Sequence, residues 1–343
     1  MALIDKLFSP NRVFIVAEIG INHNGNPDKL IKLIESAKLS GADAVKFQIF
    51  SKDLFYIPEN YLPKDISTKL PLDIFRKSFI PYDKYREAFN YSEELGILPF
   101  ATPLDLESFE FLEQLNVQMY KVASSDINYV PLLRRIAETG KVVIISSGFS
   151  KINEIKKYIR LLKNNPLVVM FCVSRYPSLP EDISLREFEL FRKEFEVTSR
   201  KRFAGFSDHT KTLSIPLAMA SLGAKVIEKH LTLDENDDSY DNAVSISPEK
   251  FKMMVEMLRE VEKSLSQRRR NLPPKFVKTM SMRSFVVRGG IAKGESITEE
   301  NIEALRPSTF VKSSLENWRK ILNKKSKKNF LDKEPLLFRF LSK

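Results

Sequence analysis

Three histidines in this chain stand at the ends of short apolar runs, where reactive groups would lie if each run were a strand of a barrel. They are His23, His209 and His230. One histidine in such a place is more often a hydrogen-bonded structural residue, but all three together favour a function. On neighbouring strands, His209 and His230 could share one divalent cation and leave positions open for a substrate oxygen. The residue types do not choose among Mn, Co, Zn and Mg.

A second group of side chains at the same run ends could bind anions. Lys46 and Lys121 supply two cations. Hydroxyl groups accompany them at Thr102, Ser124, Ser174 and Ser207. Ammonium and hydroxyl donors together suit a phosphate and a carboxylate. The alternative for each lysine taken singly is an ion-paired side chain or one that reaches to solvent.

Eight short β-branched runs alternate with longer segments of helical period between Val13 and about Lys263. Strands are predicted at Val13–Glu18, Ala44–Ile49, Ile97–Thr102, Gln118–Ala123, Val142–Ser147, Val168–Val173, Phe203–Phe206 and Lys225–Lys229. Helices are predicted at Asp28–Leu39, Tyr82–Leu95, Leu106–Leu115, Val130–Glu138, Ile152–Leu162, Leu185–Phe195, Leu213–Leu222 and Pro248–Lys263. Eight strand-then-helix units predict an α/β fold of the (β/α)8 TIM-barrel type rather than an open doubly wound sheet. Neither G-x-G-x-x-G nor a P-loop occurs.

The chain is predicted to divide into a catalytic barrel at 1–263, a linker at 264–281 and a small domain at 282–343. The linker carries Arg268-Arg269-Arg270 and Pro273-Pro274. Within the barrel, Ser51–Pro81 is too long and too rich in proline for an ordinary connection, so we expect it to cross the barrel mouth. In the small domain we expect a strand at Ser284–Val287 and a short helix capped by Thr298.

The net charge of +11 belongs entirely to the last part of the chain. Residues 1–262 hold 35 basic and 37 acidic side chains, whereas residues 263–343 hold 20 and 7. One interpretation is an arm that binds nucleic acid or an anionic surface. Few aromatic residues lie among these charges, and most such runs are only solvated, so we expect no nucleic-acid partner.

Composition excludes several classes of protein. Hydrophobic residues make up 43% and charged residues 29%, which is typical of a globular rather than a disordered chain. The single cysteine, Cys172, excludes an intrachain disulfide and a cysteine-based zinc cluster, and its apolar neighbours predict a buried, inert thiol. No apolar run is long enough to span a membrane, and Met1–Arg12 is unlike a secretory signal. We therefore expect a cytoplasmic protein with no membrane partner.

Several separated motifs occur in an order that is specific to one family. They are Ala17–Gly25 (AEIGINHNG), Gly41–Gln48 (GADAVKFQ), Phe206–Thr210 (FSDHT) and Ile227–His230 (IEKH). In these motifs the chain resembles the sialic acid synthase family. Three later segments resemble the small C-terminal antifreeze-protein-like (SAF) domain of that family: Arg283–Phe285, Ile291–Ile297 and Leu305–Pro307. The resemblance covers nearly the whole chain.

The resemblance implies a metal-dependent condensation of phosphoenolpyruvate with an open-chain N-acyl amino hexose. The acceptor would be N-acetylmannosamine or a 6-deoxy diacetamido analogue, and the products a nine-carbon 2-keto-3-deoxy acid (sialic acid or a related nonulosonate) and phosphate. The implied metal is divalent, manganese first with magnesium or cobalt as alternatives, and the implied assembly is a domain-swapped homodimer.

The resemblance also assigns roles by motif. The metal ligands would be His209 and His230. The catalytic residues would be Glu18, Lys46, Lys121 and Asp126. The substrate-binding residues would be Gln48, Thr102, Ser124, Ser174, Tyr176, Ser207, Asp241 and Arg306. In this assignment the hydroxyls and lysines hold phosphoenolpyruvate, and Arg306 reaches the N-acyl end of the sugar from the partner's small domain.

Some sugar-facing positions depart from the family's pattern. Asp126 stands where glutamate is common, Phe171 where histidine often precedes the cysteine, and Asn242 where histidine is usual. The phosphoenolpyruvate and metal motifs are intact. We therefore expect an active enzyme whose acceptor need not be N-acetylmannosamine, with legionaminate or pseudaminate precursors as rivals. The remaining alternative is a catalytically silent relative that only binds ligands.

Overall fold

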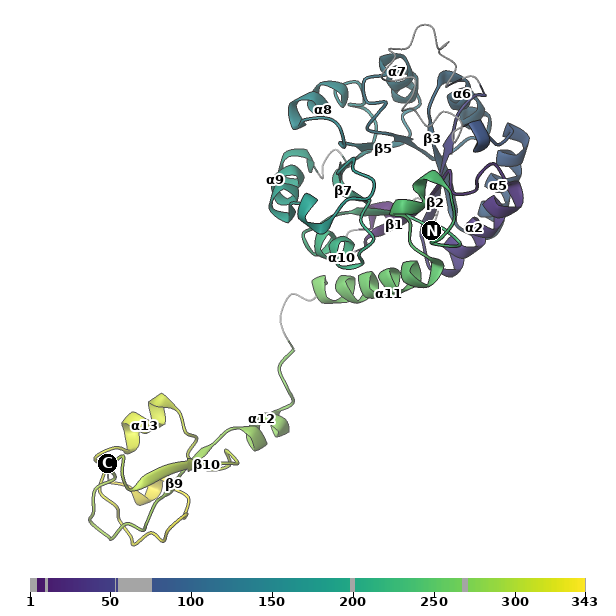
Figure 1. Ribbon diagram of the computed structural model, residues 1–343. Coiled ribbons are helices and arrows are strands. Elements are labelled where there is room, and N and C mark those ends of the chain that lie inside the picture. The colour runs from purple at the N-terminus through teal and green to yellow at the C-terminus, as the bar shows by residue number, and fades with distance from the viewer. Residues whose placement is uncertain are drawn as a thin grey trace. The chain divides into compact units, whose positions relative to one another are not determined.

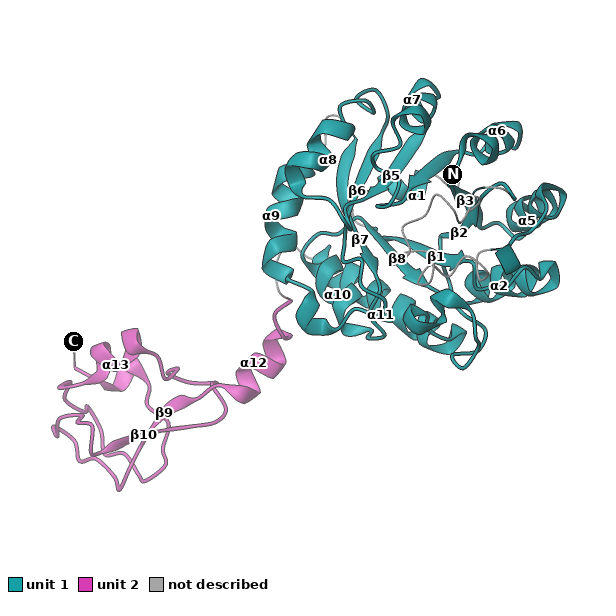
Figure 2. Ribbon diagram, turned by 45° about the horizontal axis from the view of Figure 1, so that its top comes forward, with its two compact units in different colours: residues 1–267 teal, residues 268–343 magenta. Residues whose placement is uncertain are grey.

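The computed structural model describes residues 5–9, 12–52, 54, 76–197, 201–266 and 271–342. The chain forms two compact units, residues 1–267 and 268–343 (Figure 2). Each unit is described by itself below.

The first unit is a closed barrel of eight parallel strands, in which β1 pairs with β2 on one side and with β8 on the other (Figure 1). The strands are β1 (Phe14–Gly20), β2 (Ala44–Ile49), β3 (Leu98–Pro103), β4 (Met119–Val122), β5 (Val142–Ser146), β6 (Leu167–Cys172), β7 (Arg202–Asp208) and β8 (Val226–His230). Every predicted strand is present, displaced by at most two residues at either end. The predicted (β/α)8 barrel is confirmed.

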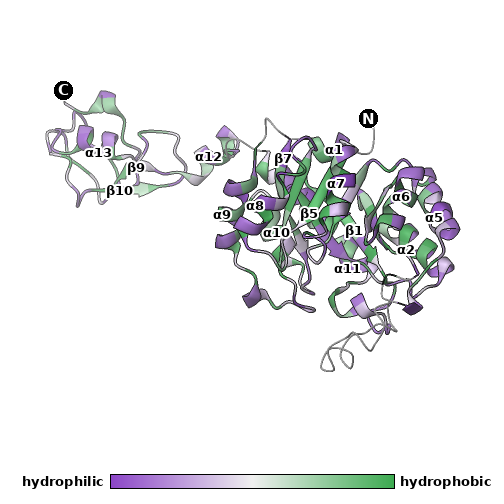
Figure 3. Ribbon diagram, turned by 90° about the horizontal axis from the view of Figure 1, so that it is seen from above, coloured by the Kyte–Doolittle hydropathy of each residue, from purple (hydrophilic) through white to green (hydrophobic). Residues whose placement is uncertain are grey.

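Helices surround the barrel and cover the outer face of the strands. They are α2 (Pro27–Leu39), α5 (Tyr82–Glu94), α6 (Leu106–Gln114), α7 (Val130–Glu138), α8 (Ile152–Tyr158), α9 (Leu185–Phe195), α10 (Ser214–Ser221) and α11 (Pro248–Leu265), with 3-10 turns η2 (Pro180–Asp182) and η4 (Tyr240–Val244). The short helix α1 (Asp5–Phe8) instead adds Leu7 to the apolar cluster inside the barrel. The eight predicted helices are all confirmed. Figure 3 shows hydrophobic residues along strands such as β5 and hydrophilic residues on the surrounding helices.

The start of α2 shows how local sequence sets these boundaries. Asn26 accepts hydrogen bonds at its side-chain oxygen from the backbone N–H groups of Asp28 and Lys29, and Pro27 occupies the first helical position. A capping asparagine followed by proline is a strong start signal, because it satisfies N–H groups that have no partner within the helix. The turn that precedes α2 is thereby held at the end of β1.

Alternate residues of each strand face the barrel interior, and their character changes along the strand. Near the N-terminal ends they are apolar and pack into one cluster, to which β1 contributes Phe14 and Val16 and β3 contributes Leu98 and Phe100. The next inward position is polar on every strand except β6, where it is a thiol. These positions are Glu18, Lys46, Thr102, Lys121, Ser146, Cys172, Ser207 and Glu228. The barrel interior is therefore packed with apolar side chains at the N-terminal ends of the strands and carries a ring of functional groups at their C-terminal ends.

The second unit has its own hydrophobic core, which includes Phe285, Val287, Ile302 and Phe330. Its elements are α12 (Lys275–Ser281), β9 (Ser284–Val287), β10 (Ile302–Leu305), α13 (Leu315–Ile321) and η5 (Phe338–Phe340), with β9 and β10 antiparallel. The predicted strand Ser284–Val287 is confirmed. Helix α12 lies within the segment predicted as a linker, and its side chains are largely exposed.

The predicted helix beginning at Thr298 is wrong. The backbone N–H of Thr298 donates to the side-chain oxygen of Asn301 at 2.8 Å, which closes a turn. The chain then forms β10, which pairs with β9 and buries Ile302. Pairing with an existing strand outweighed the local capping signal, as tertiary context often does.

Some expectations concern residues that are not described. Of the insertion Ser51–Pro81, residues 53 and 55–75 lie outside the described residues, and so does Arg268–Arg270. Among the parts of the chain that are described, no helix is long and apolar enough to cross a membrane.

Candidate active site

A cavity of about 430 Å³ opens at the C-terminal ends of the barrel strands. Twelve of the fourteen predicted site residues line it: Glu18, Lys46, Gln48, Thr102, Lys121, Ser124, Asp126, Tyr176, Ser207, His209, His230 and Asp241. These residues come from segments as distant in sequence as β1 and β8, and closure of the barrel brings them together.

Two lysines and two glutamates meet at the buried end of this cavity. Lys46 Nζ lies 2.7 Å from Glu18 Oε2 and 3.7 Å from Glu228 Oε2. Lys121 Nζ lies 3.5 Å from Glu228 Oε1. All four side chains are buried. Both lysines therefore have carboxylate partners within the protein, and their remaining N–H groups can donate to an anionic ligand.

The two carboxylates titrate in opposite directions. Burial raises the pKa of Glu18 to about 7, even though Lys46 opposes the shift. Burial also acts to raise the pKa of Glu228, but Lys121 and Lys46 outweigh it and hold this pKa at about 2. Glu228 is thus a permanent counter-ion near neutral pH, whereas Glu18 can exchange a proton there.

Glu228 is a site residue that the sequence reasoning left without a role. It accepts a hydrogen bond from Ser207 Oγ at 2.8 Å and lies against both lysines. A signal was available, because Glu228 precedes His230 by two positions on a predicted strand and therefore faces the same side. What sequence could not provide was its distance from lysines on β2 and β4.

The predicted pair of histidines is brought together, with ring centroids 5.5 Å apart. His209 Nδ1 lies 2.8 Å from the carbonyl oxygen of Val173, which can only accept a hydrogen bond, so Nδ1 carries the proton. In the neutral ring Nε2 then accepts from the Tyr176 hydroxyl at 3.0 Å. The carbonyl thereby orients the His209 ring and leaves Nε2 with the lone pair.

The surroundings of the two histidines fit a cation with open coordination positions. His230 Nδ1 and Asp241 Oδ2 are buried without a hydrogen-bond partner in the structure and lie 3.7 Å apart. Burial acts to lower the pKa of His209, yet the nearby Cys172 and the Val173 carbonyl raise it to about 9. At His230, by contrast, burial and the neighbouring His209 and Lys46 lower the pKa, so this imidazole is neutral and keeps a lone pair for a cation. Within the described residues no group of three or more His, Cys, Asp or Glu side chains could hold a metal ion, so an ion bound here would take no more than two protein ligands of these types.

Asp241 lies in η4, after β8, and its carboxylate packs against Gly20 at the end of β1. A Cβ placed on Gly20 would lie 2.6 Å from Asp241 Oδ2 and 3.0 Å from Glu18 Oε1. Gly20 also has φ of +52°, which side chains other than glycine rarely adopt. Glycine at this position therefore lets two carboxylates approach one another above the lysines.

The hydroxyl groups divide into two sets. Thr102 Oγ1 lies 3.5 Å from Lys46 Nζ, and Ser207 contacts Glu228 as described above. Ser124 Oγ and Ser174 Oγ lie 3.3 Å apart. Ser174 is not among the residues that line the cavity, although it was predicted to bind substrate, and its hydroxyl contacts the lining residue Ser124 instead. Both serines lie against Gly148, where a Cβ would approach within 2.2 Å of Ser174 Oγ.

The mouth of the cavity is lined by side chains that the sequence did not single out. Phe149 is 71% exposed and Tyr240 is 43% exposed, and both line the cavity with Leu104. Asp126, on the same wall, accepts a hydrogen bond from Ser125 at 2.8 Å, and burial raises its pKa. The cavity therefore holds lysine–glutamate ion pairs at its buried end and is partly aromatic at its mouth.

Two further residues that the sequence singled out, His23 and Arg306, do not line the cavity, whereas Cys172 does. His23 is buried outside the cavity, where its Nε2 lies 3.2 Å from the Tyr85 hydroxyl and its Nδ1 accepts from Gly25 N–H. It is the structural histidine of the three. Arg306 is exposed on the second unit. Cys172 is buried as predicted, but it also lines the cavity, with its sulfur 3.8 Å from His209 Nδ1.

Known proteins resemble this chain in sequence and structure. A model of the NeuB family matches residues 33–270. N,N'-diacetyllegionaminic acid synthase of Campylobacter jejuni is 30% identical over 94% of this chain and 98% of its own length. Pseudaminic acid synthase of the same organism is 32% identical over 95% and 96%. The N-acetylneuraminic acid synthetase of Leptospira borgpetersenii, solved with citrate, aligns with a TM-score of 0.67 and 28% identity over 77% of this chain and 89% of that one. The family model spans well over half of the sequence and the relatives align along nearly all of it, so this chain belongs to the NeuB family.

Proposed function

We propose that this protein condenses phosphoenolpyruvate with an open-chain N-acyl amino hexose, forming a nine-carbon 2-keto-3-deoxy acid and phosphate. The observation that carries the proposal is the buried pair of lysines beside hydroxyl groups, together with two imidazoles at the ends of the neighbouring strands β7 and β8. A small polyanion fits the lysines and hydroxyl groups, and the carbonyl of a second substrate fits the two imidazoles. The names of the relatives, which are synthases of three such acids, support the same reaction.

In this reaction the methylene carbon of phosphoenolpyruvate forms a bond to the aldehyde carbon of the sugar, and the aldehyde oxygen becomes a hydroxyl. Water adds to the cationic carbon left on the phosphoenolpyruvate side, and the C–O bond to phosphate then breaks, leaving the 2-keto group. Lys46 and Lys121 hold the phosphate and carboxylate. Glu18 accepts a proton from the attacking water, a role that suits its pKa of about 7. Asp126, Gln48 and Tyr176 face the sugar.

His209 and His230 would hold a divalent metal, for which we propose manganese, with magnesium or cobalt as alternatives. When bound, such an ion polarises the aldehyde carbonyl as a Lewis acid. The residues themselves orient the site, since the Val173 carbonyl fixes the His209 ring and Tyr176 packs on it with ring centroids 4.2 Å apart.

We expect His209→Ala and His230→Ala each to abolish turnover while the protein stays folded. The reason is that each removes one of only two imidazoles placed for the cation. Phosphate release and circular dichroism measure the two effects, and direct Mn²⁺ titration measures binding independently of activity. Full activity in either variant, or after treatment with a chelator, would contradict the metal assignment.

For the acceptor we propose a 6-deoxy diacetamido hexose, the precursor type of legionaminic and pseudaminic acids, in preference to N-acetylmannosamine. The aromatic side chains at the cavity mouth favour this class. An acetamido or methyl group would bury apolar surface of the exposed Phe149 ring, which is favourable, whereas a polar substituent would not. Departures at Asp126 and Asn242 from the family's pattern agree with a changed acceptor.

The second unit would be an SAF domain, and in a domain-swapped homodimer it would bring Arg306 to the partner's cavity. This proposal rests on the resemblance of residues 283–307 to that domain. We place the enzyme in the cytoplasm, where phosphoenolpyruvate is made.

A phosphate-release panel tests the proposed function. Phosphoenolpyruvate would be supplied with N-acetylmannosamine, with 6-deoxy diacetamido hexoses and with arabinose 5-phosphate, and products would be identified by mass. We expect release with a diacetamido sugar and a product mass equal to both substrates plus water minus phosphoric acid. Binding of phosphoenolpyruvate without release for any sugar would instead support a silent relative, and preference for arabinose 5-phosphate would refute the acceptor class.

A further inference from the structure

The loop that carries Asp241 is held by side chains that the proposed reaction does not use. This loop runs from Leu231, after β8, to Ser247, before α11, and contains η4. Within it, Ser245 Oγ donates to the backbone carbonyl oxygen of Asp241 at 2.6 Å. Ser245 is fully buried, and its bond is an anchor for the backbone of Asp241, whose carboxylate is also held by the backbone N–H of Ile21.

Asn22, in the turn after β1, holds both ends of η4. Its Nδ2 donates to Ser245 Oγ at 2.7 Å and to the carbonyl oxygen of Leu231 at 2.8 Å. Its Oδ1 accepts from Ser239 Oγ at 2.7 Å. The Asn22 side chain is fully buried and both of its amide donors are used, which fixes its orientation.

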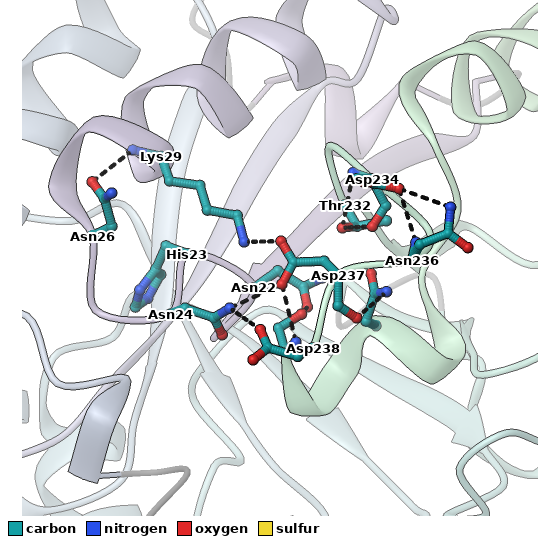
Figure 4. Close-up of polar contacts among 12 residues, drawn as sticks. Asn22, His23, Asn24, Asn26, Lys29, Thr232, Asp234, Asn236, Asp237 and Asp238 are labelled. Carbon is teal, nitrogen blue, oxygen red and sulfur yellow. Dashed lines mark hydrogen bonds and ion pairs between the residues drawn. The ribbon is translucent and has the colours of Figure 1, made fainter.

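A second, outer set of contacts joins the same two segments near the surface. Asn24 Nδ2 donates to Asp237 Oδ1 at 2.9 Å, and Lys29 forms an ion pair with Asp237. Within the loop itself, the buried side chain of Asn242 donates from Nδ2 to the Asp237 carbonyl oxygen at 2.7 Å. Figure 4 shows Asn22, Asn24 and Lys29 on one side and Asp237 and Asp238 on the other. These outer groups are partly solvated, so we expect them to contribute less than Asn22.

We propose that Asn22 is a positioning residue for the acceptor sugar, acting through the chain of hydrogen bonds from Asn22 to Ser245 to the backbone of Asp241. The proposal rests on the proposed function, in which Asp241 faces the sugar. Asn22 lines no part of the cavity and does not touch Asp241's carboxylate. Asn22 instead affects the position of the Asp241 carboxylate, which lies against Gly20 and close to His230 and Glu18.

Kinetics on single and double variants test the proposal. We expect Asn22→Ala to raise the KM for the acceptor by about tenfold or more, since small displacements of a positioning group are costly, and to change the KM for phosphoenolpyruvate little. Ser245→Ala should act in the same direction. In an Asp241→Ala background, Asn22→Ala should have little further effect on the acceptor KM, because both changes act at one point. Additive effects, or equal weakening of both substrates, would overturn the proposal.

The matched control is Asn165→Ala. Asn165 is also buried, and it donates to the carbonyl oxygen of Lys141 at 2.9 Å, before β5 and β6 begin and so at the opposite end of the strands. We expect this variant to lose stability without a change in either KM. A shift in the acceptor KM here would show that loss of any buried asparagine suffices, and would overturn the inference.

Hydrogen exchange separates this inference from the proposed function. The N–H groups of Asn242 and Ser245 donate to Ser239 and Asn242 within η4. We expect both to exchange faster in Asn22→Ala, while amides of β4 and β5 keep their protection. Unchanged exchange in η4 would overturn the positioning role even if the enzyme is active. Faster exchange in a protein that turns over no sugar would sink the proposed function and leave the structural role of Asn22 standing.

Discussion

Glu18 and Glu228 show how position decides the role of a residue type. The two carboxylates share Lys46, yet the pKa of Glu18 is raised to about 7 by burial while that of Glu228 is held near 2 by two lysines. Glu18 accepts a hydrogen bond from Gln48 Nε2 at 3.1 Å and pairs with Lys46. Glu228 lies against both lysines. Such divergence between neighbouring carboxyl groups is typical of acid–base assignments in enzymes.

The raised pKa of Glu18 predicts a pH dependence. If Glu18 accepts the proton of the attacking water, kcat should rise as pH passes through about 7, and Glu18→Gln should be slow and lack this rise. The pH profile of phosphate release measures it. A wild-type profile retained in Glu18→Gln would contradict the assignment.

The raised pKa of Glu18 also predicts that the stability of the fold decreases as pH rises, whereas kcat increases. A buried carboxyl group with a raised pKa is most favourable to folding when protonated, so its contribution is present below the unfolded pKa of 4.5 and is lost as pH rises through about 7. We expect the wild-type Tm to fall across this window relative to that of Glu18→Gln. Thermal unfolding at several pH values measures the difference, and parallel curves would contradict it.

At the scale of elements, a buried ion pair joins the two strands that lead into His209 and His230. Lys229 Nζ lies 2.6 Å from Asp208 Oδ2, and both side chains are fully buried. Asp208, the last residue of β7, directly precedes His209, and Lys229 directly precedes His230 at the end of β8. Successive residues point to opposite faces of a strand, so the pair joins β7 to β8 outside the barrel lumen while the histidines face the cavity.

Lys229→Met should therefore destabilise the protein strongly, by about 3–5 kcal/mol, because it leaves the buried Asp208 charge without its partner. Equilibrium urea unfolding measures the change. The double variant Lys229→Met with Asp208→Leu should recover much of the loss, since neither charge then remains buried.

The control for this prediction is an exposed ion pair, Lys320 with Glu316 on α13. Lys320→Met should leave the unfolding curve nearly unchanged, because solvent screens that pair. A comparable loss for Lys320→Met, or none for Lys229→Met, would show that burial of the pair does not carry the effect.

At the scale of the whole molecule, the predicted site residues are divided between two compact units. The barrel unit holds thirteen of the fourteen predicted site residues, twelve of them on the cavity wall, while Arg306 belongs to the unit 268–343, which also carries the excess of positive charge. We expect Arg306→Ala to raise the KM for the sugar with a smaller effect on phosphoenolpyruvate, since the guanidinium would bind only the N-acyl end. Arg319, exposed on the same unit, provides a matched arginine whose change to alanine should alter neither KM. Equal weakening of both substrates by Arg306→Ala would contradict its placement.

Much of the barrel and its site could be read from sequence, because the signals are local. The period of two along each strand placed Glu18, Lys46, Thr102 and Lys121 on the inner face, and short turns between strands and helices left little freedom in their order. Where a local sequence signal competed with pairing to a distant segment of the chain, the prediction from sequence was wrong. Thr298 looks like a helix cap, but pairing of β10 with β9 decided its conformation.

Sequence by itself determined the family, the strand pattern and the set of groups at the barrel mouth. Tertiary structure alone decided which of them touch: that Glu228 joins both lysines, that His23 is structural, and that Asn22 reaches Ser245, 223 residues away. The physical reason is closure of the sheet. Pairing of β1 with β8 sets distances between residues that no local pattern relates, and those distances fix the charges and pKa values on which the chemistry depends.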